Sequence, residues 1–345
     1  MSVTNAPDRE RPGDRGAPTG PRGPAQRRPR RNPLTAVRGF ETVAILVLLM
    51  VVFAATSGTF LTQQNLVNVV SVQTITAVMT LAVLLPLIIG EFDLSVGYQL
   101  GLLAMLMAVV AQHTSSALVV MLAGPVAGAL IGLLNGLLTV YAKISSFIAT
   151  LGVGILLSGA TQGISRGQVI FSNIPSAVTD LSRTGFAGLP MSVWLTLLFA
   201  AILFYVLEYT PAGRFWYAIG GSQRVSFLAG IRTNRLRVLA FVFSGMLVGI
   251  AANFALAQAG SANPGYGPDL LLPAYAAAFL GVTTFRPGYY NVVGCLVAIL
   301  LLAIGFNGLS LLGVPFWVQP IFNGAALLIA VLVARQETRQ VRVGG

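Results

Sequence analysis

The chain has 345 residues, of which 55% are hydrophobic and only 9% are charged, and its mean hydropathy is +0.81. Soluble domains carry about 25% charged residues, so this composition excludes an ordinary soluble protein and indicates a chain solvated by a membrane. The net charge of +11 alone is compatible with nucleic-acid binding, but its distribution along the chain argues against that partner. Long, continuous apolar runs favour membrane-spanning helices over the alternating strands of a β-barrel.

Residues 1–38 form a basic segment with nine arginines and almost no apolar residues. Such a composition is typical of disorder, and the basic stretch is too long for a signal peptide. We interpret it as a disordered cytoplasmic tail that lies near anionic membrane lipid and anchors the topology. A specific binding role is the alternative.

Ten apolar segments follow within residues 39–335, which we interpret as one polytopic domain. The segments are 42–61, 66–89, 96–112, 116–141, 144–162, 191–209, 238–258, 270–284, 292–312 and 316–334. With ten spans and a cytoplasmic N-terminus, 19 basic residues face the cytoplasm and only Arg166 and Arg183 face outward. This agrees with the positive-inside rule and predicts that both termini, including a short tail at 336–345, are cytoplasmic.

Two connecting segments are longer than a simple turn. The external segment 163–190 is polar and is expected to be a lid, a docking surface or a plain connector. The cytoplasmic segment 210–237 carries five basic residues and two sets of helix signals. Thr210-Pro211 and Ser222 are typical helix starts, while Gly220-Gly221 and Gly230 are typical stops. These signals predict two short helices.

A weak internal repeat relates the two halves of the chain. Asp93 precedes an apolar segment and is followed 42 residues later by Asn135, and Asp269 is followed 38 residues later by Asn307. Each asparagine begins an Asn-Gly-Leu sequence. Five predicted spans separate the copies, so they would have opposite orientations in the membrane. Inverted repeats of this kind build many transporter cores.

Glu91 and Asp93 lie close together beside apolar segments, in the sequence GEFDLSVG. We favour a broken-helix turn in which Asp93 and Ser95 accept backbone N–H groups. The alternative is that the two acids bind a proton or an ion in a secondary transporter. The spans also contain the amides Asn135, Asn253, Asn307 and Asn323, which either join helices or line a path for a neutral, hydroxylated solute.

From this pattern we expect a substrate path between the repeats, formed by six residues: Asp93, Ser95, Asn135, Thr150, Asn253 and Asn307. The sequence has no zinc motif, no Ser-His-Asp set and no phosphate-binding loop. It therefore predicts no catalytic residue, no metal site, no cofactor bound by the chain and no enzymatic activity. The single Cys295 lies in an apolar run, which indicates a packing role.

GEFDLSVG resembles the GGIDLSVG signature of the sugar-type ABC permeases, which include the ribose, arabinose and xylose transporters. The resemblance continues in order through FIATLG, GRFWYAIGGSQRVSFLAGI, FSGMLVGIAA and NGLSLLGVPFWVQPIFNGAALLIAV. Glu91 departs from the second glycine of the signature. Ser222-Gln223-Arg224 stands where the family usually has Asn and acidic residues, so the ATPase partner is not specified by this match.

The resemblance implies a transport subunit of the bacterial plasma membrane that pairs with a second permease chain, most simply as a homodimer. An ATP-hydrolysing subunit would supply the energy, and an extracytoplasmic sugar-binding protein would deliver a small neutral sugar or polyol. Segment 210–237 matches the region that engages the ATPase in this family. The residues expected to couple are Gly213, Arg214, Phe215, Ile219, Gly220, Arg224, Gly230 and Ile231. An ion-coupled secondary transporter is the alternative function.

Overall fold

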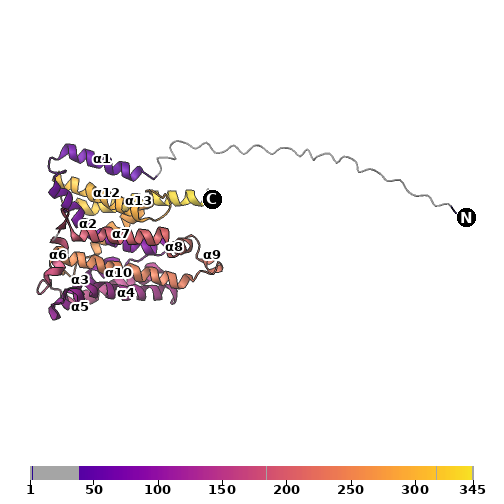
Figure 1. Ribbon diagram of the computed structural model, residues 1–345, viewed down its shortest axis with the longest axis horizontal. Helices are drawn as coiled ribbons and strands as arrows, with labels where there is room; N and C mark the ends of the chain where they lie inside the picture. Colours follow the sequence, from indigo (N-terminus) through magenta and orange to yellow (C-terminus); the bar gives the residue numbers. More distant parts are fainter. Residues whose placement is uncertain (1, 3–38, 184, 316, 344–345) are drawn as a thin grey trace. The chain divides into compact units, whose positions relative to one another are not determined.

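A computed structural model describes residues 2, 39–183, 185–315 and 317–343, with side chains described as far as residue 334. The basic tail expected at 1–38 lies almost entirely outside the described residues. The compact unit from Val37 onward is built from helices (Figure 1). The all-α class predicted from the sequence is confirmed.

Ten apolar helices of the described chain correspond to the ten apolar segments. Seven are long and apolar enough to cross a membrane: α2 (Gln63–Ile88), α3 (Val96–His113), α4 (Ala117–Val140), α5 (Ser146–Ser165), α7 (Met191–Tyr209), α10 (Thr233–Ala259) and α12 (Val292–Leu311). Three have shorter apolar stretches: α1 (Glu41–Thr56), α11 (Pro268–Gly281) and α13 (Val318–Val343).

The helix ends differ from the predicted segments where local chemistry overrides hydropathy. α1 ends at Thr56 rather than at residue 61, because Ser57 to Thr62 form a hydrogen-bonded turn. α11 begins at Pro268, where the missing proline N–H costs nothing in a first helical turn. The backbone of α13 stays helical to Val343, so the segment expected as a separate tail at 336–345 begins as helix.

The external segment contains local structure of its own. It includes helix α6 (Ser176–Arg183) and a small antiparallel hairpin of β1 (Gly185–Phe186) and β2 (Leu189–Pro190). Val178 is fully buried, and the Ser182 hydroxyl donates to the carbonyl oxygen of Ala257 in α10 at 2.7 Å. This segment is therefore packed against the bundle rather than extended as a bare connector.

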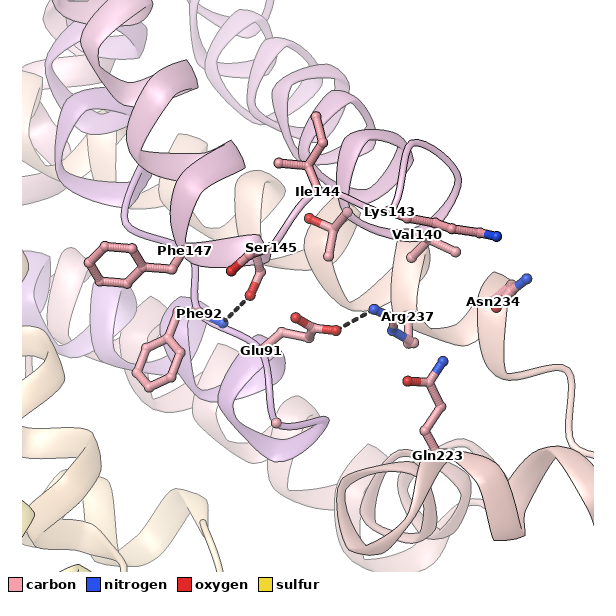
Figure 2. Close-up of a pocket in the computed structure, with 13 residues that line it drawn as sticks. Glu91, Phe92, Val140, Lys143, Ile144, Ser145, Phe147, Gln223, Asn234 and Arg237 are labelled. Atoms are coloured by element: carbon pink, nitrogen blue, oxygen red, sulfur yellow. Dashed lines mark hydrogen bonds and ion pairs between the residues drawn. The ribbon is translucent and has the colours of Figure 1, made fainter.

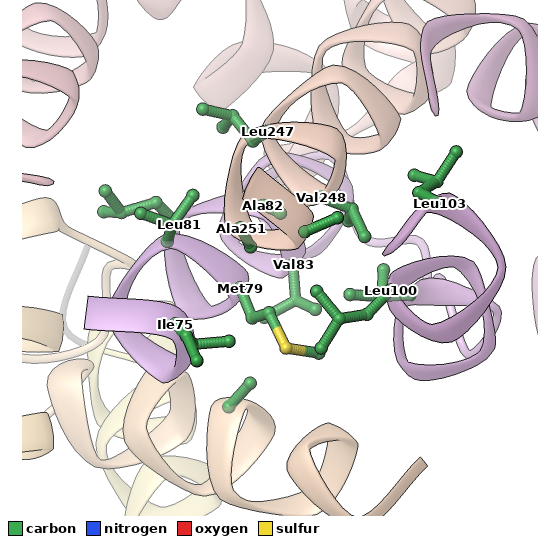
Figure 3. Close-up of a cluster of buried hydrophobic side chains, with 14 of the residues drawn as sticks. Ile75, Met79, Leu81, Ala82, Val83, Leu100, Leu103, Leu247, Val248 and Ala251 are labelled. Atoms are coloured by element: carbon green, nitrogen blue, oxygen red, sulfur yellow. The ribbon is translucent and has the colours of Figure 1, made fainter. Parts of the chain in front are cut away.

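Two long helices, α2 and α10, form the centre of the bundle and are mostly buried. Their apolar side chains interdigitate with those of α3 in one large cluster, part of which Figure 3 shows: Ile75, Met79, Leu81, Ala82, Val83, Leu100, Leu103, Leu247, Val248 and Ala251. By contrast, most residues of α4, α5 and α7 are not buried within the described chain. These outer helices present the surface that lipid or another protein chain would cover.

Glycines bring α4 and α10 into backbone contact. A Cβ atom at Gly128 would overlap the carbonyl oxygen of Gly245, and one at Gly245 would overlap that of Gly128. Gly132 approaches the Phe241 carbonyl oxygen equally closely, and Gly124 approaches that of Gly249 less closely. Small residues at such crossings are typical of membrane helix pairs, because van der Waals packing replaces the hydrophobic effect there.

The two short helices predicted in segment 210–237 are present as α8 (Pro211–Gly221) and α9 (Gln223–Leu228). Pro211 occupies the first turn of α8, and the Ser222 hydroxyl accepts the backbone N–H of Val225 at the start of α9. Gly230 has a φ of +82°, the left-handed conformation that ends the pair. Thr210 differs from the expected cap, because its hydroxyl donates backward to the carbonyl oxygen of Val206 in α7.

Candidate functional site

The chain interrupts its helical path between α2 and α3, at residues 89–95. Pro86 precedes this helix break, and Gly90 has a φ of +79° that other residues adopt at a cost. Figure 1 shows α8 and α9 at one end of the bundle, with α6 at the opposite end. A Cβ atom at Gly220 would overlap the carbonyl oxygen of Ile88, so α8 rests directly on the end of α2. The helix break therefore lies beside the two short helices.

A fully buried polar cluster occupies the C-terminal side of the helix break. The Oδ1 atom of Asp93 accepts the Ser95 backbone N–H at 3.1 Å and the Ser95 hydroxyl at 2.5 Å. The Ser95 hydroxyl oxygen accepts Gln99 Nε2 at 2.6 Å and Asn135 Nδ2 at 2.8 Å. All four side chains are buried, and no lysine or arginine among the described residues donates a hydrogen bond to Asp93. The cluster thus ties the break to α3 and α4 without a counter-charge.

The backbone of the break is held by hydroxyl groups from other helices. Thr150 Oγ1 in α5 accepts the N–H of Leu94 at 2.9 Å, and Ser146 Oγ accepts the N–H of Phe92 at 3.2 Å. The Tyr275 hydroxyl of α11 lies 3.0 Å from both the backbone nitrogen and the carbonyl oxygen of Asp93. Backbone groups left free by the broken helix are thereby satisfied inside the bundle, as burial at membrane depth requires.

Four of the six residues expected along a substrate path come together here: Asp93, Ser95, Asn135 and Thr150. The other two belong to different contacts. Asn253 Nδ2 donates to the Met121 carbonyl oxygen at 3.0 Å, joining α10 to α4. Asn307 exchanges a pair of 3.0 Å hydrogen bonds with Asn65, joining α12 to α2. Of the two roles considered for the amides, Asn253 and Asn307 therefore have the contacts expected of residues that join helices.

Glu91 turns away from the buried cluster and forms an ion pair with Arg237 in the first turns of α10. The Glu91 and Arg237 side chains are only 16% and 11% exposed. They lie at the wall of an open cleft of about 760 Å³ between the helix break, the end of α4, the start of α5 and α9. Figure 2 shows Lys143, Gln223 and Asn234 around the same cleft.

The apolar side chains of α8 and α9 divide into two sets. Trp216 and Ile219 are buried, and Trp216 Nε1 donates to the carbonyl oxygen of Leu236 at 3.0 Å. Phe227 and Leu228 are 67% and 76% exposed, with Phe215 and Val225 also exposed. The first set fixes the short helices to the bundle, and the second set is an apolar surface without a partner within the described chain.

The other expected coupling residues lie on or next to this surface. Gly213 is buried at a close backbone approach to Leu207, and a Cβ atom there would overlap the Leu207 carbonyl oxygen. Arg214 and Arg224 are exposed, and Ile231 is half-buried.

Sequence reasoning missed Arg237, Gln99 and Tyr275 as parts of this region. Gln99 could have been predicted from the sequence, because it follows Ser95 by one helical turn and therefore lies on the same face of the helix. The Glu91–Arg237 pair spans 146 positions and Asp93–Tyr275 spans 182, so no local pattern marks them.

The described residues contain no group of three or more His, Cys, Asp or Glu side chains arranged to hold a metal ion. Cys295, the residue expected to serve packing, is buried.

Comparison with known proteins identifies the family of the chain. Residues 65–332 match the family described as the permease component of the branched-chain amino acid transport system. This match covers most of the chain. The chain belongs to this family. It is a transport subunit rather than an enzyme, and it is a multi-pass protein of the bacterial inner membrane.

Curated relatives also match over most of the chain. The chain is 32% identical to the ribose import permease protein RbsC of Escherichia coli K12 over 294 residues, which cover 84% of this chain and 91% of the relative. It is 30% identical to RbsC of Bacillus subtilis, covering 85% and 91% of the two chains. It is also 30% identical to the autoinducer 2 import system permease protein LsrD of Escherichia coli O9:H4, covering 85% and 90%.

No solved structure gives a significant match to the chain. The resemblance to sugar-type ABC permeases indicated by the sequence motifs is confirmed by the family and its relatives.

Proposed function

We propose that the chain is the permease subunit of an ABC importer and moves a small neutral sugar or polyol into the cell. Relatives named for the import of ribose and of autoinducer 2 support this substrate class. The chain itself binds no cofactor in this proposal. ATP is hydrolysed by a partner subunit in the cytoplasm, and an extracytoplasmic sugar-binding protein supplies the solute.

The observation that carries the proposal is the attachment to the helix break of both α8 and the start of α10, the helix that follows α9. On one side, Gly220 of α8 lies against the end of α2 at Ile88. On the other side, Arg237 in the first turns of α10 pairs with Glu91 of the break. A displacement of the short helices is therefore transmitted to the break directly through the packing of α8 and, through the start of α10, by an ion pair.

The exposed apolar surface of Phe215, Val225, Phe227 and Leu228 is the surface that engages the ATPase in this proposal. Exposed arginines, Arg214 and Arg224 among them, surround it. An apolar centre with a charged rim is the common anatomy of a protein–protein interface. A partner groove with apolar walls and an acidic rim would be complementary to it.

The proposed topology has ten spans in two inverted repeats, with both chain ends and α8–α9 in the cytoplasm. Five apolar helices precede α6 and five follow it, α7 and α10 to α13, which is the count that two repeats require. The positive-inside count supports this orientation. A second copy of the chain would cover part of the exposed apolar surface of the outer helices.

Uptake by intact bacteria tests the function. Cells that lack their own pentose importers and express this permease with its ATPase and binding protein should accumulate ¹⁴C-labelled ribose, arabinose, xylose or galactose. ATP depletion should stop the accumulation, and an inactive ATPase variant is the matched control. Uptake that an uncoupler abolishes while the ATPase variant leaves it intact would instead identify an ion-coupled transporter.

A further inference from the structure

A second cavity lies in the half of the bundle away from α8 and α9, between α2, α10, α11, α12 and α13. It has a volume of about 120 Å³. Gln258 at the end of α10 and Gln319 and Asn323 at the start of α13 are among the residues that line it. Tyr266 and Val72 at its edge are partly or largely exposed. We name this space the amide cavity, after four lining residues: Gln73, Gln258, Gln319 and Asn323.

The cavity exists because α12 does not approach α2 as α4 approaches α10. The glycines of α12 are used in other directions: Gly305 faces Phe322 of α13, and Gly308 faces Phe53 of α1. Within the described part of the chain, no glycine contact therefore draws α12 onto α2 at this level. Ile75 and Thr76 of α2 lie opposite Ile299, Leu302 and Ala303 of α12 across the space.

Three of the four amides in this cavity differ from the other amides of the bundle in their hydrogen bonding. Asn135, Asn253 and Asn307 each hydrogen-bond to another helix. Within the described chain, the side chains of Gln73, Gln319 and Asn323 hydrogen-bond to no protein group, so their donors and acceptors face solvent or a solute. Gln319 is exposed, whereas Gln73 and Asn323 are half-buried, and a half-buried amide left open in this way is available for recognition.

Gln258, the fourth amide of the cavity, is held in place by hydrogen bonds to α2 and keeps one acceptor free for a solute. Its Nε2 donates to the Ser71 carbonyl oxygen at 2.8 Å and to the Thr74 hydroxyl at 2.9 Å. Both donors of the amide are thereby used, and its carbonyl oxygen remains as an acceptor. A side chain fixed by neighbouring bonds loses little conformational freedom when it binds a solute.

The chemistry of the lining selects a neutral, hydroxylated solute. Among the described residues, no Asp, Glu, Lys, Arg or His lines the amide cavity. Gln73, Gln319 and Asn323 offer donors and acceptors, which match the two roles of a hydroxyl group, and Gln258 offers an acceptor. Tyr266 and Phe306 offer aromatic faces to C–H groups. The volume corresponds to about four water molecules at about 30 Å³ each, which suits one small ring or a short polyol rather than an oligosaccharide.

We propose that the amide cavity is the site at which the permease itself holds its solute during passage. This inference rests on the proposed function and adds a location to it. It assigns solute recognition to Gln73, Gln258, Gln319 and Asn323, and it gives the buried cluster around Asp93 the separate task of fixing the helix break.

Leucine variants test the site by removing the amide while retaining its approximate size. Gln73→Leu and Asn323→Leu are each compared with Gln64→Leu, which changes an exposed amide near the start of α2 and outside the cavity. Initial uptake of the ¹⁴C-labelled pentoses and galactose is measured with permease abundance in the membrane and co-purified ATPase. Both cavity variants should lose at least tenfold in uptake, while Gln64→Leu retains the wild-type rate.

A labelling measurement covers the case in which a leucine variant fails to fold. Asn323→Cys is treated with a small, membrane-impermeant maleimide, because Cys295 is fully buried and gives little background. A transported sugar should slow the labelling at least threefold, whereas a sugar that is not transported should leave it unchanged. Equal labelling with both sugars would overturn the proposal.

The outcomes separate the two proposals. Wild-type uptake of a sugar together with undiminished uptake by both leucine variants overturns the cavity assignment and leaves the importer function standing. Failure of the wild-type complex to take up any of the sugars overturns both.

Discussion

At the scale of single residues, the Glu91–Arg237 pair links the start of α10, the helix that follows the two short helices, to the helix break. The acid stands where the family signature has glycine, so this chain places a charge beside the break that the signature lacks. Arg237 also has a buried Nε atom without a partner in the described chain. Both side chains are largely shielded from water, and so the pair is screened less by salt than an exposed pair would be.

This pair predicts energetic coupling between two distant positions. Glu91→Gln and Arg237→Gln should each lower the melting temperature, and the double variant should lose less than the sum of the two. The coupling free energy should be about 1–2 kcal/mol, because each single change leaves a shielded charge unpaired. Thermal unfolding of the detergent-solubilised protein measures it. Additive effects of the two substitutions would show that the pair contributes no interaction energy.

Other residues show why sequence reasoning located only part of this region. The motif around Asp93 pointed to a broken helix in which Asp93 and Ser95 both accept backbone N–H groups. Asp93 accepts the N–H of Ser95, but the Ser95 side chain makes no capping hydrogen bond, because its oxygen accepts the Gln99 and Asn135 amides instead. The assignment of Asn253 and Asn307 to the same place rested on residue type, and the structure gives each a different helix pair. The partners of the break come from α5, α10 and α11, and their proximity depends on the packing of the whole bundle.

At the scale of elements, α8 and α9 were predictable because their signals are local. Proline, serine and glycine specify the starts and stops of these helices through backbone conformation and capping. The sequence did not reveal which of their faces packs on the bundle. Trp216 and Ile219 of α8 face inward, on the helix that approaches Ile88 closely at Gly220. Phe227 and Leu228 of α9 face outward.

Two neighbouring glycines provide a matched test of this contact. A Cβ atom at Gly220 would overlap the Ile88 carbonyl oxygen, whereas one at Gly221 would have nothing within 4 Å. Gly220→Val should therefore displace α8 and reduce ATP-dependent uptake at least tenfold, and Gly221→Val should retain most of it. Uptake is compared at equal permease abundance in the membrane. Equal activity of the two variants would contradict a coupling role for the α8 contact.

At the scale of the whole molecule, hydropathy predicted an all-helical membrane protein, because a long, continuous apolar run with few charges is typical of a membrane-spanning helix. Seven helices of the described chain are long and apolar enough to cross a membrane, and three more are apolar but shorter. The boundaries of α1 and α11 shifted where turns and prolines decide the helix ends. The central position of α2 and α10 and the open space beside α12 depend on glycine contacts between distant segments. Those contacts follow from three-dimensional packing, so the sequence pattern alone did not reveal them.

The central claim is that the chain forms the path of an ATP-driven importer and receives its energy through α8 and α9. Proteoliposomes that contain the purified permease and its ATPase test this most directly, with the sugar-loaded binding protein supplied on the opposite side from ATP. We expect labelled sugar to cross only when ATP is hydrolysed, and Gly220→Val to stop transport while Gly221→Val does not. Sugar movement without the ATPase, or ATP-driven movement unaffected by Gly220→Val, would contradict the account.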